Sequence, residues 1–203
     1  MHTIEAPNRE ETRCPWCGDD PLYVRYHDEE WGRPRSDEAA MFEFLILESA
    51  QSGLSWLTIL RKREGYRRAF AGFDPELVAR FGSEDVERLV LEPGIVRHRG
   101  KIEAAIGNAR AALRLREAGS SISELAWSRV GGKTRVSHFE RLSDVPASTP
   151  ESIDFAREMK SLGFRHFGPV VAYSHMQALG LFDDHLVGCR SRAKREASGA
   201  EAF

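Results

Sequence analysis

A helical repeat of apolar residues near the middle of this 203-residue chain is the strongest constraint on its fold. The repeat has the spacing of one face of an α-helix, and its members are Ile102, Ile106, Ala109 and Leu113. Alternating patterns typical of strands are nearly absent, apart from a short stretch around residues 135–139. The sequence therefore predicts an all-α fold.

Start and stop signals divide the rest of the chain into further helices. Asp and Thr before a proline read as a cap followed by the first helical turn, and glycines end several segments. The predicted helices cover residues 39–47, 56–63, 75–81, 83–92, 99–117, 150–162 and 169–179. We expect a flexible N-terminus over 1–12, one domain over 13–190 and a flexible tail over 191–203, with a division into two helical lobes near 119–148 left open.

Charge and composition exclude several classes of protein. The 29 basic and 31 acidic residues give a net charge of −2, so any nucleic-acid site depends on local arrangement. No apolar run approaches the roughly 20 residues that span a bilayer, and the first residues lack the apolar core of a secretion signal. We therefore expect no membrane association and a cytoplasmic location.

Cysteine and histidine gather near the two ends of the chain. Cys14 and Cys17 stand at the start with His27 after them, and His185 precedes Cys189 by four residues near the finish. Thiolates and imidazoles are the ligands that tetrahedral zinc prefers, and four protein ligands make a structural site. Spacing leaves the choice of four ligands among these five residues open, and buried thiols with ordinary histidines are the alternative.

Two glycines bracket a tight turn between two predicted helices at residues 159–172. Gly163 follows one helix, and Gly168 with Pro169 begins the next. Glycine lets the backbone approach another molecule closely, and a helix N-terminus presents free N–H groups to an anion. This is the layout of a helix-hairpin-helix element that holds a DNA phosphate, although such a turn can also be purely structural.

Glu48 shares the apolar face of its predicted helix with Phe44 and Leu45. A carboxylate there is costly unless it is paired or has a function, and a position at the helix end in solvent is the alternative. Electron-rich rings beside a carboxylate suit a flat cationic ligand. Five of the eight Trp and Tyr residues lie in the first 56 positions: Trp16, Tyr23, Tyr26, Trp31 and Trp56.

The loop at residues 51–55 joins two predicted helices and contains Gln51, Gly53 and an isolated Leu54. An exposed leucine at such a place suits a wedge that enters stacked bases. The basic runs at 61–68 and 97–101 suit either solvated helix faces or contacts to a phosphate backbone.

Five blocks of the sequence resemble the constitutive 3-methyladenine DNA glycosylase I family. They are RCPWCGDDPLYVRYHDEEWG, LESAQSGLSW, GIVRHRGKIEAAIGNARA, GFRHFGPVVAYSHMQALG and DDHLVGC, in order from about Arg13 to Cys189. The resemblance implies an α-helical enzyme of the helix-hairpin-helix superfamily that hydrolyses the N-glycosidic bond of 3-methyladenine in alkylated DNA. It also implies one structural zinc ion that joins the termini, with ligands Cys14, His27, His185 and Cys189; Cys17 departs from the family pattern, and a swap with Cys14 stays open.

The resemblance also assigns roles to the aromatic cluster and to the loops. Glu48 is the expected catalytic residue, Gly53 and Leu54 form the expected wedge, and Gly163 and Gly168 hold a phosphate of double-stranded DNA. We expect a monomer. The expected base-binding residues are Tyr26, Trp56, Trp16, Tyr23, Trp31 and Gln51.

Three positions refine this expectation. Val170 stands where strand-cleaving relatives carry a lysine, so base removal without lyase activity is expected. Asp183 and Asp184 lie beside His185, and we expect them to orient it.

The alternatives are a non-catalytic zinc and helix-hairpin-helix DNA-binding module, or a glycosylase for a different lesion. The group that activates water and the breadth of lesion selectivity stay open.

Overall fold

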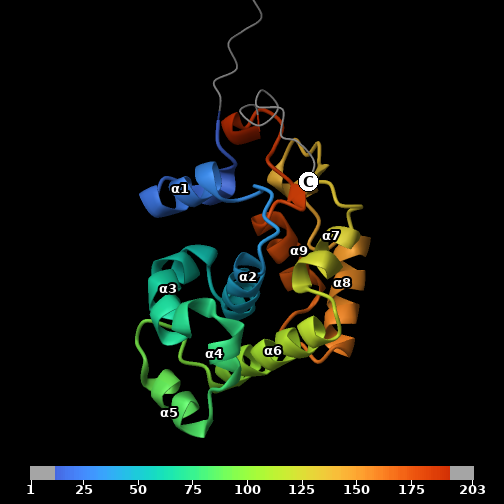
Figure 1. Ribbon diagram of the computed structural model, residues 1–203. Helices are drawn as coiled ribbons and strands as arrows, with labels where there is room; N and C mark the ends of the chain where they lie inside the picture. The colour runs from blue at the N-terminus through green and yellow to red at the C-terminus, as the bar shows by residue number, and fades with distance from the viewer. Residues whose placement is uncertain (1–11, 193–203) are drawn as a thin grey trace, which may run out of the picture.

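Helix α2 (Glu38–Gln51) runs through the middle of the molecule, and the other helices surround it (Figure 1). The computed structural model describes residues 12–192. Every residue from 40 to 50 is buried. A helix that is apolar on all sides needs neighbours on every face. Those that α2 packs against are α3 (Trp56–Ala69), α6 (Arg99–Glu117), α7 (Ile122–Ser128) and α9 (Pro169–Ala178).

Side-chain caps set the starts of most helices. The carboxylate of Asp20 accepts from the backbone N–H of Leu22 and Tyr23, and Asp74 does the same for the helix that follows it. These bonds satisfy donors that have no partner within the helix. The remaining elements are η1 (Pro15–Cys17), α1 (Pro21–Glu29), η2 (Ala71–Phe73), α4 (Pro75–Ala79), α5 (Ser83–Leu91), β1 (Arg135–Val136), η3 (Leu142–Asp144), α8 (Pro150–Ser161) and β2 (Phe182–Asp183).

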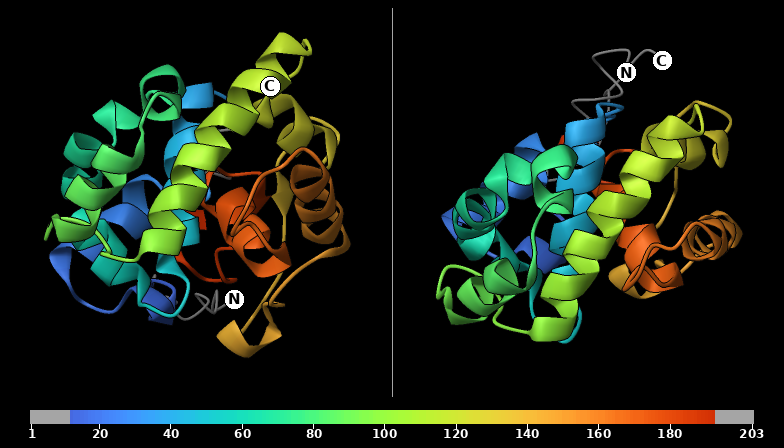
Figure 2. Two further views of the ribbon diagram at one scale, coloured as in Figure 1. Left: turned by 90° about the horizontal axis from the view of Figure 1, so that it is seen from below. Right: turned by 60° about the horizontal axis from the view of Figure 1, so that its bottom comes forward.

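The longest helix, α6, separates two groups of helices. Seen from below, it crosses the molecule with α3, α4 and α5 on one side and α7, α8 and α9 on the other (Figure 2). Helices α4 and α5 pack against α6, while α8 and α9 pack against each other. Because α2 contacts members of both groups, it joins them.

The predicted helical class is confirmed, and each predicted helix is present. Two helices were missed: α1, and α7 within the segment expected to be a loose connection. The ambiguous stretch near residue 135 forms β1, which pairs in parallel with β2 through Arg135 opposite Phe182 and Val136 opposite Asp183. These are the only two named strands in residues 12–192.

The two ends of the described chain meet. Thr12 forms a parallel bridge with Cys189, and the Arg190 N–H donates to the Thr12 carbonyl at 3.0 Å. Ser191 and Arg192, expected in a flexible tail, are buried. Arg192 donates to the His185 carbonyl, so the folded body extends through this residue. The other residues of the expected flexible ends, 1–11 and 193–203, lie outside the described residues.

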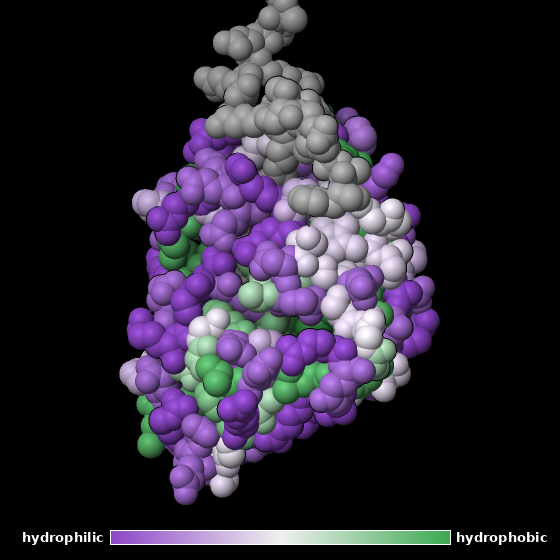
Figure 3. Space-filling model, viewed as in Figure 1, coloured by the Kyte–Doolittle hydropathy of each residue, from purple (hydrophilic) through white to green (hydrophobic). Residues whose placement is uncertain are grey.

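The face of the molecule seen in Figure 3 is largely hydrophilic, and apolar residues show mainly in recesses between the helices. None of the helices between residues 12 and 192 combines the length and apolar character that a membrane crossing needs.

A buried histidine connects α9 with the central helix. His175 is fully buried between Phe155 and Phe167, and its Nε2 lies 2.9 Å from the Met41 carbonyl oxygen. Because a carbonyl only accepts, Nε2 carries the proton, and Nδ1 has no hydrogen-bond partner among the described residues. Burial lowers the pKa of His175 to about 4.

We predict that His175→Phe reduces the loss of stability in acid. In the wild type the unfolded chain takes up this proton near pH 6.5 and the folded protein only near pH 4. The free energy of unfolding therefore falls as pH drops through this window, by up to about 1.4 kcal/mol per pH unit from this residue. Urea unfolding of both proteins at several pH values checks this. Parallel pH dependences for wild type and variant would contradict it.

Candidate base-binding site

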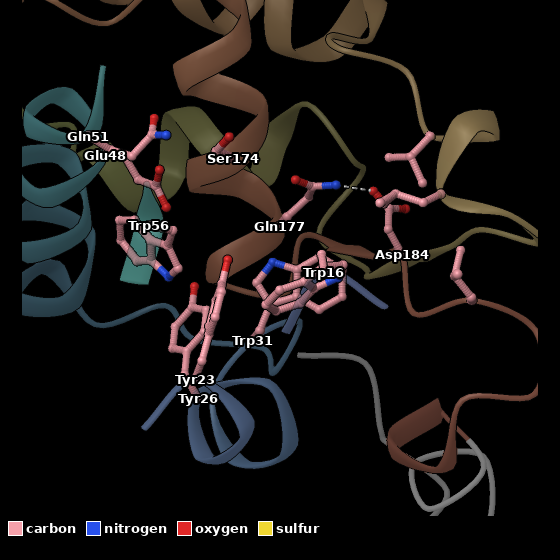
Figure 4. Close-up of a pocket in the computed structure, with 13 residues that line it drawn as sticks. Trp16, Tyr23, Tyr26, Trp31, Glu48, Gln51, Trp56, Ser174, Gln177 and Asp184 are labelled. Atoms are coloured by element: carbon pink, nitrogen blue, oxygen red, sulfur yellow. Dashed lines mark hydrogen bonds between the residues drawn. The ribbon is translucent and has the colours of Figure 1, made fainter. Parts of the chain in front are cut away.

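A pocket of about 220 Å³ opens between α1, α2, α3 and α9 (Figure 4). This space far exceeds the roughly 10–15 Å³ that one water molecule needs. Chain segments far apart in the sequence build it, because α2 and α9 lie side by side in the core. Its lining residues are Trp16, Tyr23, Tyr26, Trp31, Glu48, Gln51, Trp56, Leu142, Val145, Ser174, Gln177, Asp184 and Leu186.

Aromatic rings form one wall of this pocket. The Trp16 ring centroid lies 5.1 Å from Tyr23 and 4.9 Å from Trp31, and Tyr26 lies 5.6 Å from Trp56. Such tilted and edge-on contacts hold each ring in a fixed orientation. Helix α1 supplies both tyrosines, so the helix that the sequence prediction missed carries part of the site.

Glu48 projects from α2 into the pocket, with 5% of its surface exposed. No hydrogen bond or ion pair from residues 12–192 reaches its carboxylate. Burial alone raises the pKa of Glu48 to about 8. The same helix buries Glu43, whose carboxylate accepts from Arg63 at 2.8 Å and from Arg67 at 2.9 Å. Glu48 is therefore a buried acid without a partner among the residues that the structure describes.

Two further buried polar atoms of the lining have no hydrogen-bond partner in the described part of the chain. They are the indole Nε1 of Trp56 and Oδ1 of Asp184. Buried polar groups are normally paired, and an unpaired donor in a pocket is a feature of ligand sites. The pocket thus offers a ligand a donor, a carboxyl group and several ring faces.

Sequence reasoning missed the residues of the opposite wall. Ser174 and Gln177 stand three positions apart on α9 and face the pocket. Asp184 also lines it and does not orient His185 as expected; its Oδ2 accepts from Gln177 Nε2 at 2.7 Å and from the Tyr173 hydroxyl. Their three-residue spacing predicts that the two side chains share one face of α9. It does not predict that this face lines a pocket.

Three of the expected metal ligands come together at the junction of the chain ends. The Sγ atoms of Cys14 and Cys189 and a ring nitrogen of His27 all lie within 4.8 Å of one another, and all three residues are buried. This group could hold a metal ion. His185 is adjacent, its ring 4.8 Å from that of His27, but does not belong to the group. Cys17 is buried nearby and lies outside it.

A carboxylate orients each of the two histidines. The Nδ1 of His27 lies 2.8 Å from Asp28, and the Nδ1 of His185 lies 2.7 Å from Asp183. Each pairing leaves Nε2 for other partners; Nε2 of His27 lies 3.5 Å from the Cys189 sulfur. Metal-bound histidines are commonly held in this way. Of the two aspartates expected to orient His185, Asp183 does so.

The loop after α2 is held by hydrogen bonds from Lys101. Gly53 has a φ of +83°, which favours glycine, and Leu54 is 39% exposed. The Nζ of Lys101 donates to the carbonyls of Ala50 at 2.8 Å and Ser52 at 2.6 Å. Lys101 therefore supports the loop.

Most of the basic run at 61–68 is bound internally. Arg61 pairs with Asp20, and Arg63 pairs with both Glu30 and Glu43. These ion pairs connect α3 to α1 and α2.

The turn between α8 and α9 is a glycine-bracketed hairpin. Gly163 has a φ of +92°, and Gly168 caps α9 with Pro169 in its first turn. Burial, together with the nearby Arg165, His98 and Lys101, lowers the pKa of His166 in this turn. Basic side chains thus gather here, at the opposite end of α9 from Gln177.

Residues 16–193 match the model of the methyladenine glycosylase family. The chain belongs to this family. It is 49% identical over 177 residues to DNA-3-methyladenine glycosylase 1 of Escherichia coli K12, covering 87% of this chain and 95% of that protein.

Solved structures of methyladenine glycosylases have the same fold. A crystal structure of 3-methyladenine DNA glycosylase I is 47% identical with a TM-score of 0.87, covering 88% of this chain and 98% of that one. A tyrosine-to-phenylalanine variant of such an enzyme, solved with 3-methyladenine, is 41% identical with a TM-score of 0.85, covering 88% and 96%.

We predict that Glu48→Gln stabilises the protein at alkaline pH. The unfolded chain loses the Glu48 proton near pH 4.5 and the folded protein near pH 8. The free energy of unfolding of the wild type therefore falls as pH rises between these values, by up to about 1.4 kcal/mol per pH unit, and the glutamine variant lacks this term. Denaturant unfolding from about pH 5 to about pH 9 measures the difference. A difference independent of pH would show that Glu48 is solvated in the folded protein.

Proposed function

We propose that this methyladenine glycosylase hydrolyses the N-glycosidic bond of 3-methyladenine in alkylated, double-stranded DNA. The observation that carries the proposal is the buried Glu48, which has no partner in the described part of the chain and lies next to the rings of Tyr26 and Trp56. The family match and the related structure that contains 3-methyladenine support the same substrate. The enzyme acts as a monomer on a base that has left the duplex.

Charge provides the selectivity in this proposal. Methylation at N3 gives the base of the damaged nucleotide a positive charge, whereas intact adenine is neutral. A cation beside Glu48 lowers the pKa of its carboxyl, so the acid ionises when the damaged base enters. The pocket's aromatic faces attract the same charge. A neutral base leaves the acid protonated and loses both attractions.

The same charge makes the bond easy to break. As the bond from C1′ to N9 lengthens, its electron pair moves to the base, which leaves neutral, and positive charge develops on the sugar. Water then adds to C1′ and releases a proton. Fixed negative charge near the sugar stabilises such a transition state in a site shielded from solvent. We assign this electrostatic role to Glu48.

Two loops hold the DNA in this proposal. Leu54, on the loop that Lys101 supports, occupies the space in the duplex that the extruded base leaves. The hairpin from Gly163 to Gly168 binds a phosphate through the N–H groups that begin α9, as a helix-hairpin-helix element does. Val170 offers no amine for a Schiff base, so the strand stays intact after base removal.

A structural zinc ion fits the junction of the chain ends. The donors are two buried thiols and two imidazoles whose Nδ1 atoms are bonded to carboxylates. A hydrogen bond from Cys14 lowers the pKa of Cys189, which favours a thiolate there. Cys14, His27, His185 and Cys189 would hold the ion. When bound, it cross-links the chain ends and supplies no step of the reaction.

The activity is tested with duplex DNA treated with a methylating agent, followed by chromatography of the released bases. We expect release of 3-methyladenine and an intact strand. Glu48→Gln lowers kcat/KM by on the order of 10- to 100-fold, since a charge-assisted contact contributes about 1.5–3 kcal/mol. Glu117→Gln, at an exposed position on α6, is the matched control and retains the activity.

Other results of this assay would contradict the proposal. DNA binding without any base release from the wild type would indicate a non-catalytic binding module. Equal release of neutral damaged bases would show a different substrate and would exclude the charge-based selectivity.

The metal site is tested by elemental analysis of protein purified without added metal. We expect about one zinc ion per chain. His185→Ala loses the ion and lowers the Tm by more than about 5 °C, because metal binding contributes directly to folding. Cys17→Ser is the matched control and keeps the ion. A folded wild type without metal would contradict the site. Loss of zinc in Cys17→Ser would show that Cys17, and not Cys14, belongs to the ligand set.

A further inference from the structure

One polar side chain on the wall opposite Glu48 has a fixed orientation. Gln177 projects from α9 into the pocket, and its Nε2 donates to Oδ2 of Asp184 at 2.7 Å. In Figure 4 the dashed line marks this bond, and the amide oxygen points the other way, toward the side of the pocket that holds Glu48.

Asp184 imposes this orientation. The residue is 2% exposed, and the Tyr173 hydroxyl donates to the same Oδ2. A carboxylate oxygen accepts hydrogen bonds and repels another oxygen, so the amide nitrogen of Gln177 must face it. The protein keeps this carboxylate buried with Oδ1 unpartnered among the described residues, a costly arrangement that needs a purpose.

We propose that Gln177, oriented by Asp184, selects among methylated purines by the group at C6 of the base. The inference rests on the proposed function and names its specificity. The fixed amide presents an acceptor to the cavity, and an ionised Glu48 is an acceptor on the other wall. A 6-amino group donates to such acceptors. A 6-oxo group, as in 3-methylguanine, is itself an acceptor and is repelled by these acceptors.

The charge of the lesion does not make this distinction. Both 3-methyladenine and 3-methylguanine are cationic within DNA, so the aromatic wall and Glu48 attract both through charge. Discrimination between them requires a hydrogen-bonding group of fixed polarity, since a buried acceptor left facing another acceptor costs binding energy. Gln177 is a group of this kind, and its polarity is set by a residue outside its own helix.

The experiment measures the ratio of kcat/KM for 3-methyladenine to that for 3-methylguanine, released from the same methylated duplex DNA. Gln177→Met keeps the length of the side chain and removes the acceptor, and we expect the ratio to fall at least about tenfold. In Asp184→Asn the new amide can accept or donate, so Gln177 is free to turn, and the ratio falls although Gln177 is intact.

Glu117→Gln, at an exposed position on α6, is the matched control, and we expect an unchanged ratio. Circular dichroism and metal content show whether each variant is folded. If Asp184→Asn does not fold, Gln177→Met decides the question.

Two failures are distinguishable. A wild type that releases 3-methyladenine, with an unchanged ratio in folded Gln177→Met, overturns the role of Gln177 and leaves the proposed function in place. A wild type that releases no 3-methyladenine overturns the proposed function, and this inference with it.

Discussion

The complete burial of α2 is the constraint on which the rest of the structure depends. A helix with neighbours on every face has no solvent for its charged residues, so each must find a partner or be held at a cost. The two glutamates in its buried stretch show both outcomes. Glu43 is neutralised by two arginines of α3, whereas Glu48 faces a cavity and keeps its proton to about pH 8. The packing of one helix thus creates both a stable core and a pocket with a buried, unpaired acid.

The walls of the pocket come from opposite ends of the sequence and have different properties. The N-terminal wall consists of rings in mutual contact and attracts charge without regard to the pattern of hydrogen bonds. The C-terminal wall presents a polar group with a defined direction. In the function we propose, the first wall and Glu48 recognise that a base is methylated, and the second recognises which base it is.

Most of the fold could be predicted from the sequence, because apolar periodicity and proline-linked caps are local signals. Helix α1 could also have been found: Asp20-Pro21 repeats the signal used at Asp74-Pro75. The two-residue strands could not, since nothing within a two-residue segment identifies its partner 47 positions away. The aromatic residues and Glu48 were identifiable as one candidate site, but pattern alone left Glu48 equally compatible with solvent. The sequence places Asp184 next to a histidine. Only the path of the chain after α9 shows that it accepts a hydrogen bond from Gln177.

The junction of the chain ends is in direct contact with the aromatic wall. The Trp16 ring lies 5.2 Å from that of His27, and the Trp31 ring lies 4.6 Å from that of His185. Because the rings of each pair are in contact, a rotation of either imidazole would press on an indole that lines the cavity. Oxidation of the thiols at this junction would therefore alter the shape of the pocket. The residues that join the two chain ends therefore also determine which ligands the shape of the pocket can accommodate.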